Sequence, residues 1–107
     1  MSTHHFIVFS EAQPGREDEY NDWYDNRHLP DVLAVPGFVG ARRFRLQSDA
    51  DSPACASRYL AVYDIDTNNL TETMAELFRR KNTARMPISD ALNMASIKTY
   101  VADPLGD

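Results

Sequence analysis

His28 is the residue of this sequence best suited to move a proton, because it is the only histidine in the middle of the chain and has aromatic neighbours at helical spacing. A neutral imidazole with an ordinary pKa of roughly 6.5 can take a proton from a substrate at neutral pH. Tyr24 precedes His28 by one helical turn, where its hydroxyl can donate to a developing oxyanion or orient the imidazole. The spacing therefore predicts His28 and Tyr24 as catalytic residues.

Each of these side chains also has a structural interpretation. A histidine at a helix C-terminus caps the last carbonyl groups and complements the helix dipole, and a tyrosine on an apolar helix face is more often part of a core. Tyr20 and Trp23 extend the aromatic stripe, which is commonly packing, and we predict them at most to line a substrate pocket. Asp31 follows His28 by three residues and can polarise the imidazole if the chain remains helical. The sequence leaves these alternatives open.

Two arginines in a later strand pattern can bind an anionic group. Arg42 and Arg43 are neighbours in an alternating segment, so their side chains point to opposite faces of a sheet. Arg42 shares the face of Phe44, and we predict Arg42 and Phe44 as substrate-binding residues. The structural alternative is pairing with surface carboxylates.

The sequence contains no compact set of metal ligands. His4 and His5 are adjacent on a strand pattern and must point to opposite faces, so they cannot form a metal pair with each other. A histidine such as His28 can also serve as an axial haem ligand, a role that the absorbance spectrum of the purified protein would settle. We expect no metal and no cofactor.

The helix that carries these residues is predicted to begin near Arg16, after a turn at Pro14 and Gly15. On a helical wheel its aromatic residues and His28 fall on one side, and its acidic residues fall on the other. Pro30 disfavours helical geometry at the residue before it, so the regular helix is expected to end near His28. The imidazole would then lie at a helix terminus.

Four strand patterns and a second helix complete the chain. The strands are expected at residues 4–10, 38–47, 57–66 and 94–101, and the second helix at residues 70–81. This βαββαβ order predicts an α+β, ferredoxin-like fold, a four-stranded antiparallel sheet with two helices on one face. We place Tyr59 and Tyr63 on the open face, which is then too apolar for water, and expect a second copy to cover it in a homodimer.

Length and composition exclude several function classes. The 107 residues suit one domain, residues 1–107, and the net charge of −5 argues against nucleic acid as a partner. No apolar run approaches the roughly 20 residues needed to span a bilayer, so we expect no membrane insertion. With Cys55 as the only cysteine and no signal-peptide pattern, we expect a cytoplasmic protein. The few glycines form no nucleotide-binding fingerprint.

Residues 20–45 resemble a known family. An aromatic-rich helix, a His-x-Pro motif and a Pro-Gly turn are followed by a basic run, and these features stand here as Trp23, Tyr24, His28, Pro30, Pro36, Gly37, Phe38, Arg42, Arg43 and Phe44. In these residues the sequence is similar to the EthD-like proteins of the dimeric α/β-barrel superfamily. The resemblance implies two sheets that form a barrel between subunits, with a cavity in each subunit that the His28 position faces. The superfamily includes isomerases, cyclases, monooxygenases, aldoxime dehydratases and haem-handling enzymes, so the fold does not decide the reaction.

We predict a cofactor-free lyase or isomerase acting on a small molecule, of aromatic or polyketide-like kind. His28 would serve as general acid or base in isomerisation, elimination, retro-aldol cleavage or cyclisation. One alternative is a cofactor-independent monooxygenase acting on a phenolic substrate, which oxygen uptake would distinguish. The other is a non-catalytic EthD-like accessory or ligand-binding protein, in which replacement of His28 would leave binding nearly intact.

Overall fold

The computed structural model describes residues 2–47 and 57–106, and its elements follow the predicted βαββαβ order. The strands are β1 (Ser2–Ser10), β2 (Phe38–Arg45), β3 (Tyr59–Thr67) and β4 (Lys98–Ala102). The helical elements are α1 (Glu17–Trp23), the π-helical turn η1 (Tyr24–His28), α2 (Leu29–Leu33), α3 (Leu70–Arg80) and the 3-10 turn η2 (Met94–Ser96). The predicted loop around Cys55 lies outside the described residues.

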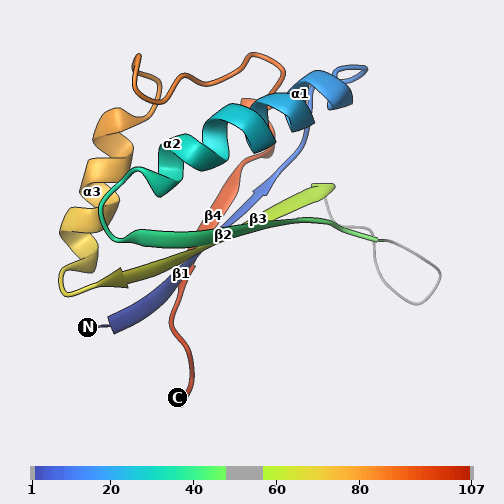
Figure 1. Cartoon of the computed structure of the whole chain (residues 1–107). Coiled ribbons are helices and arrows are strands. Elements are labelled where there is room, and N and C mark those ends of the chain that lie inside the picture. The colour runs from blue at the N-terminus through green and yellow to red at the C-terminus, as the bar shows by residue number, and fades with distance from the viewer. Residues whose placement is uncertain (1, 48–56, 107) are drawn as a thin grey trace.

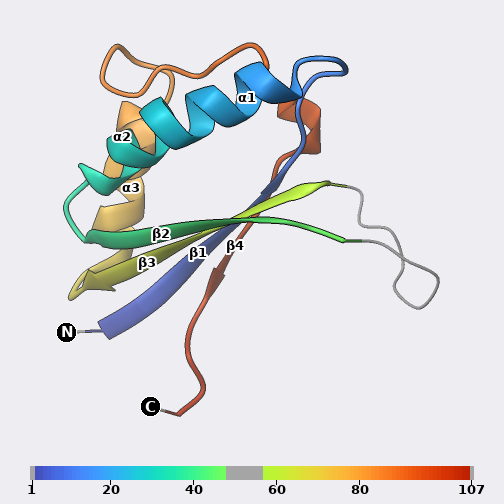
Figure 2. The same ribbon diagram turned by 45° about the vertical axis from the view of Figure 1, so that its right-hand side comes forward.

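The strands form one antiparallel sheet in the order β2-β3-β1-β4. The continuous helix formed by α1, η1 and α2 crosses one face of the sheet together with α3, and the opposite face carries no helix (Figures 1 and 2). The ferredoxin-like prediction is therefore confirmed. No helix in the described part of the chain is long and apolar enough to cross a membrane.

Helix α3 begins and ends where the sequence indicates. The Asn69 side chain accepts a hydrogen bond from the Glu72 backbone N–H at 3.0 Å, which caps the helix. The last strand starts later than predicted, at Lys98, because residues 94–96 form a 3-10 turn. Asn93 caps this 3-10 turn, because its side-chain oxygen accepts a hydrogen bond from the Ala95 backbone N–H at 3.1 Å.

The prediction that the first helix ends near His28 is wrong, because helical backbone continues to Leu33. The Leu29 N–H bonds to the Tyr24 carbonyl, five residues back, so the chain widens into a π turn. A new α-helical segment starts after this turn and contains Pro30 in its first turn, where the missing N–H is tolerated. The helix therefore continues through Pro30, with a π turn before it and a new α-helical segment around it.

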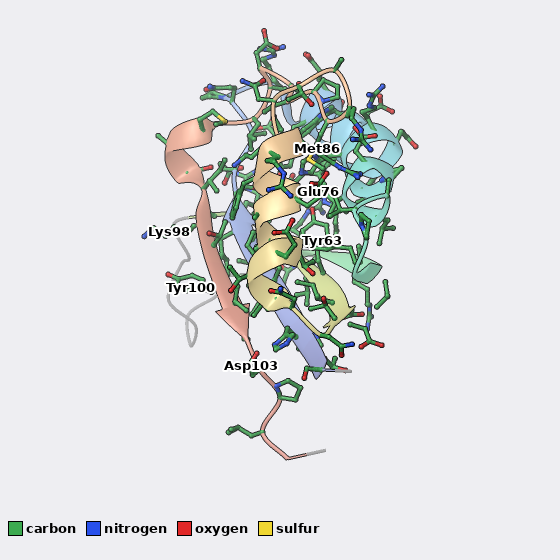
Figure 3. All side chains as sticks on the ribbon, turned by 90° about the vertical axis from the view of Figure 1, so that its left-hand side faces the viewer. Tyr63, Glu76, Met86, Lys98, Tyr100 and Asp103 are labelled. Atoms are coloured by element: carbon green, nitrogen blue, oxygen red, sulfur yellow. The ribbon has the colours of Figure 1, made fainter. Side chains whose placement is uncertain are left out.

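The prediction that Tyr59 and Tyr63 lie on the open face is also wrong. Both are buried on the helix-covered face, with 6% and 1% of their surface exposed, and Ile65 is buried beside them. Figure 3 shows Tyr63 between the sheet and α3, whereas Tyr100 projects from β4 away from that helix. Alternation along β3 was correct, but the aromatic side chains pack in the core of the chain itself.

Arg42 and Arg43 lie on opposite faces of β2 as predicted, but a bulge earlier in the strand places Arg43, not Arg42, on the face that the helices cover. Phe38 pairs with Ile65 and Gly40 pairs with the preceding residue of β3, so the register shifts at Val39. Beyond the bulge Arg43 lies opposite Ala61, on the face that the helices cover. Arg42 and Phe44 consequently occupy the open face of the sheet.

Candidate functional site

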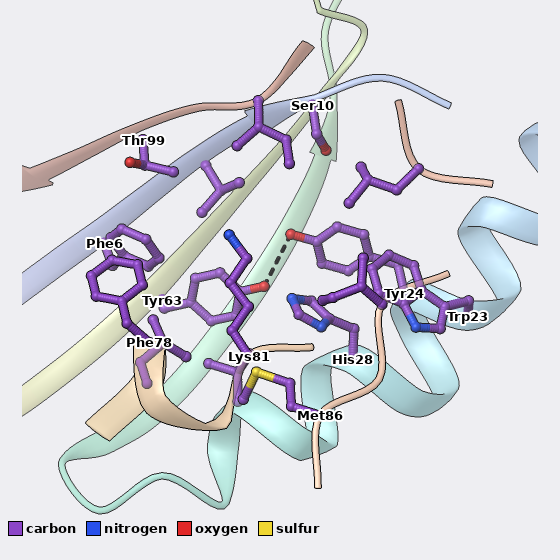
Figure 4. Close-up of a pocket in the computed structure, with 16 residues that line it drawn as sticks. Phe6, Ser10, Trp23, Tyr24, His28, Tyr63, Phe78, Lys81, Met86 and Thr99 are labelled. Carbon is purple, nitrogen blue, oxygen red and sulfur yellow. Dashed lines mark hydrogen bonds between the residues drawn. The ribbon is translucent and has the colours of Figure 1, made fainter. Parts of the chain in front are cut away.

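A cavity of about 180 Å³ lies between the helices and the sheet (Figure 4). Its walls come from strands β1, β3 and β4, from the helix formed by α1, η1 and α2, from α3, and from the loop that follows α3. Most of the lining is apolar and includes Phe6, Val8, Trp23, Val32, Leu77, Phe78, Met86, Ile88, Leu92 and Ile97. The polar groups of the wall are Ser10, Tyr24, His28, Tyr63, Lys81 and Thr99. A few polar groups in an apolar cavity are typical of a small-molecule site.

His28 lies in this wall and is held by aromatic contacts. Its ring stacks on Trp23 with centroids 4.7 Å apart and meets Tyr24 edge to face at 5.0 Å. The buried Nδ1 atom has no hydrogen-bond partner among the described residues. Because the helix continues past His28, the interpretation of this residue as a C-terminal helix cap is wrong.

Burial keeps the His28 imidazole neutral. It lowers the pKa of His28 to about 4, with smaller lowering contributions from Lys81 and Arg43 and an opposing one from Asp31. The Asp31 carboxylate does not hold the ring, because it pairs with the Arg27 guanidinium at 2.7 Å. At neutral pH the cavity therefore contains an uncharged imidazole that can accept a proton.

Tyr24 and Tyr63 form a buried hydroxyl pair beside the imidazole. The Tyr63 hydroxyl donates to the Tyr24 oxygen at 3.0 Å (Figure 4). Burial raises the pKa of Tyr24 to about 12 and raises the pKa of Tyr63 well above its usual value, so both phenols stay protonated. In this arrangement the Tyr24 proton has no acceptor within the described residues, and it can be donated to an oxygen of a ligand.

The other two aromatic residues of the predicted site differ in position. Trp23 lines the cavity and its indole N–H donates to the Pro87 carbonyl at 3.2 Å. Tyr20 is fully buried behind the wall, where its hydroxyl lies 2.5 Å from the Ser10 hydroxyl. Trp23 is thus placed to touch a ligand, whereas Tyr20 supports the wall.

Arg42 and Phe44 are not brought to the cavity, and the arginine that reaches the aromatic cluster is Arg43. Its guanidinium carbon lies 4.3 Å from the centroid of the Tyr24 ring, a cation–π contact. Its nitrogens donate to Asp25 and Asn21, each at 2.9 Å. Arg43 therefore supports the Tyr24 ring, and its guanidinium group already has hydrogen-bond partners.

Sequence reasoning missed Tyr63, Lys81 and Arg43. Tyr63 was assigned to the wrong face of β3, although the same alternation places it with Ile65 in a pattern that fits the core. For Lys81 the sequence pattern predicts only the end of the second helix. The position of Arg43 depends on the β2 bulge, for which the sole signal was Gly40 within a strand pattern.

Comparison with known proteins supports this architecture. No family model matches the sequence, and no curated protein matches it. An EthD-like protein of Ralstonia eutropha has a TM-score of 0.66 at 14% identity, covering 96% of this chain and 92% of that one. An EthD family protein of Bacillus halodurans has a TM-score of 0.58 at 12% identity, covering 98% and 100%. The chain has the fold of the EthD-like proteins.

A third match shows how varied proteins of this fold are. The heme-degrader MhuD of Mycobacterium tuberculosis, solved with two hemes in its active site, has a TM-score of 0.63 at 15% identity over 97% of both chains. Identities this low establish the shared fold alone. The chemistry of this protein therefore depends on the residues of its own cavity.

The depressed pKa of His28 predicts an acid-side loss of stability. The unfolded chain binds a proton on His28 below about pH 6.5, whereas the folded protein resists that proton until about pH 4. As pH falls through this window, wild type should lose about 3 kcal/mol more unfolding free energy than His28→Gln. Urea unfolding of both proteins across the window measures the difference. Parallel curves would show that burial does not shift the pKa.

Proposed function

We propose that the protein is a cofactor-free enzyme that moves a proton on a small carbonyl compound with an apolar body, with His28 as the general base. The observation that carries this proposal is the neutral imidazole in the wall of an apolar cavity, beside a tyrosine hydroxyl whose proton is free for a ligand. Lyase or isomerase chemistry fits this pair of groups. Enzymes that use proton transfer commonly combine a base with such an oxyanion donor.

The proton balance of the step is simple. The imidazole takes a proton from a carbon next to the substrate carbonyl and becomes an imidazolium, while the electron pair moves to the carbonyl oxygen. Tyr24 donates a hydrogen bond to that enolate oxygen, and Tyr63 supports Tyr24 through its own hydrogen bond. The imidazolium then returns the proton to another atom of the substrate or to a leaving group. Isomerisation and elimination differ only in this last acceptor.

The cavity does not fit haem. Its volume of about 180 Å³ lies below the roughly 300 to 1,000 Å³ of pockets that enclose drug-sized ligands, and haem is larger than most of these. His28, the candidate axial ligand, is stacked against Trp23 with a buried Nδ1. The size and lining of the cavity therefore do not suit the haem chemistry of the heme-degrader that shares this fold.

A cofactor-independent monooxygenase acting on a phenol is the second candidate. The aromatic lining by Phe6, Trp23 and Phe78 favours a ring-shaped substrate, and a neutral imidazole can form the phenolate that such a reaction needs. Oxygen consumption separates this candidate from simple proton transfer. A compound that binds but undergoes neither reaction would indicate a binding or accessory protein.

We predict that His28→Gln loses about 10² to 10⁴ in the rate of proton abstraction, because the amide cannot serve as the base. Small ring-containing ketones and phenols that raise the melting temperature of the wild type supply the test compounds. Exchange of their C–H protons in deuterated water, followed by NMR, measures abstraction directly, and an oxygen electrode reports oxidation. Tyr24→Phe should lose less, since it removes one stabilising hydrogen bond.

The melting temperature of each variant is the control for folding. If His28→Gln folds normally and exchanges within a few-fold of wild type, His28 is not the base, and the binding or accessory interpretation replaces the enzyme.

We further propose that the chain is a homodimer that buries the open face of the sheet. Ile7 lies between Val62 of β3 and Tyr100 of β4 in the strand register, and Phe9 packs edge to face on Tyr100 at 6.1 Å. Tyr100 is 56% exposed in the single chain. An apolar strip of this kind on the face without helices is typical of a surface that a partner covers.

Ile7→Asp is predicted to convert the dimer into monomers, because a carboxylate buried without a partner costs several kcal/mol. Sedimentation of wild type should give one species near twice the 12.1 kDa chain mass. Thr3→Asp, on the same strand and face but near its exposed end, is the matched control and should remain dimeric. A wild type that sediments as a monomer at micromolar concentration would refute the proposal.

A further inference from the structure

We propose that the ligand of this cavity is a single-ring organic acid, or a molecule of that size, whose anionic oxygen is held by Lys81. This inference rests on the proposed function, since it names the substrate class of the same site. Lys81 is the C-cap residue of α3, and its side chain extends among the residues that line the cavity (Figure 4). Among the described residues that line the cavity, it is the one lysine or arginine.

Charge pairing in the rest of the protein sets Lys81 apart. In the described chain, Arg79 and Arg80 at the same helix end pair with Glu72 and Glu76 at 2.6 to 2.7 Å, whereas Lys81 has no carboxylate within 4 Å. The lining of the cavity contains no aspartate or glutamate. An unpaired cation beside an apolar cavity is complementary to a ligand that carries a negative group on an apolar body.

The helix dipole does not account for this lysine. Basic residues in the last turn complement the C-terminal carbonyl groups of a helix, but Arg79 and Arg80 already occupy that turn of α3. Arg80 also donates to the Ala34 carbonyl at 3.2 Å, which ties α3 to the end of α2. Lys81 is therefore not needed for either task, and its side chain extends among the cavity residues instead.

Around Lys81, none of the residues that the structure describes pairs a carboxylate with the ammonium group. Lys81 also borders an outer hollow that contains Asp90, but the Asp90 carboxylate pairs with Arg16 at 2.7 Å. Lys81 thus stands where the cavity meets this hollow. An acid bound in the cavity would place its anionic oxygen at the ammonium group and its apolar body against Phe6 and Phe78.

The size of the cavity limits that apolar body. An apolar cavity on the order of 150 Å³ holds one benzene-sized molecule, so about 180 Å³ accommodates a single ring with a small substituent. A multi-ring substrate would require movement of the walls. The ligand class is accordingly a small, single-ring carboxylic acid.

Binding of such an anion would also help the proposed base. The positive charge of Lys81 contributes to the low pKa of His28 in the free protein. An anionic group on Lys81 offsets that contribution, so the His28 pKa should rise on binding, while burial, the largest cause of the low pKa, still holds it below its ordinary value. The imidazole would become a stronger base when substrate is present.

The test compares benzoate with benzamide, its neutral analogue of the same shape. Benzoate at millimolar concentration should raise the melting temperature of the wild type, and its affinity by calorimetry should exceed that of benzamide. Lys81→Met, which keeps the length of the side chain and removes its charge, should weaken benzoate by about tenfold or more and leave benzamide unchanged. Arg85→Met, an exposed cation next in sequence to the cavity residue Met86, is the matched control and should bind benzoate normally.

The outcomes separate this inference from the proposed function. Equal affinity of wild type for benzoate and benzamide, or no stabilisation by benzoate, phenylacetate or cyclohexanecarboxylate, would overturn the role of Lys81. His28→Gln should retain benzoate binding, because the imidazole is neutral in the free protein. If benzoate binding depends on Lys81 while His28→Gln leaves proton exchange intact, the anion site stands and the catalytic proposal fails.

Discussion

The missing backbone N–H of Pro30 is the constraint on which the site depends. A helix that passes through proline loses one hydrogen bond, and this chain absorbs the loss by widening residues 24–28 into a π turn before α2 begins. The turn keeps Tyr24 and His28 on the face that packs against the sheet. Trp23 then covers the imidazole, and the buried ring loses the solvent that would stabilise its charged form.

The aromatic layer beneath this helix connects the turn to the sheet. Tyr24 meets Tyr63 of β3 through a hydrogen bond, Tyr20 packs on Tyr59 with ring centroids 5.1 Å apart, and Arg43 lies against the Tyr24 ring. These contacts replace water around the phenols and fix their hydroxyl groups in place. The same packing that forms the core therefore raises the pKa of Tyr24 and of Tyr63 and keeps both phenols protonated.

Hydrophobic periodicity was sufficient to predict the fold and the helix that carries the site. His28, Tyr24 and Trp23 could be placed together because residues one turn apart share a helix face. The two faces of the sheet were harder to assign, because alternation predicts which residues share a face but not which face packs against the helices. Tyr59 and Tyr63 were therefore placed outward, and the unrecognised bulge at Val39 exchanged the roles of Arg42 and Arg43. The presence of the Lys81 ammonium group at the cavity depends on the direction of one flexible side chain, which no local sequence pattern specifies.

The proposed chemistry requires a His28 imidazole that is neutral because it is buried, and an NMR titration of the ring tests this directly. The nitrogen and carbon resonances of His28, assigned by comparison with His28→Gln, should titrate with a pKa near 4 in the free folded protein. A titration near 6.5, the value of a solvated histidine, would contradict it, because the ring would then be accessible to water and the cavity would not control its charge.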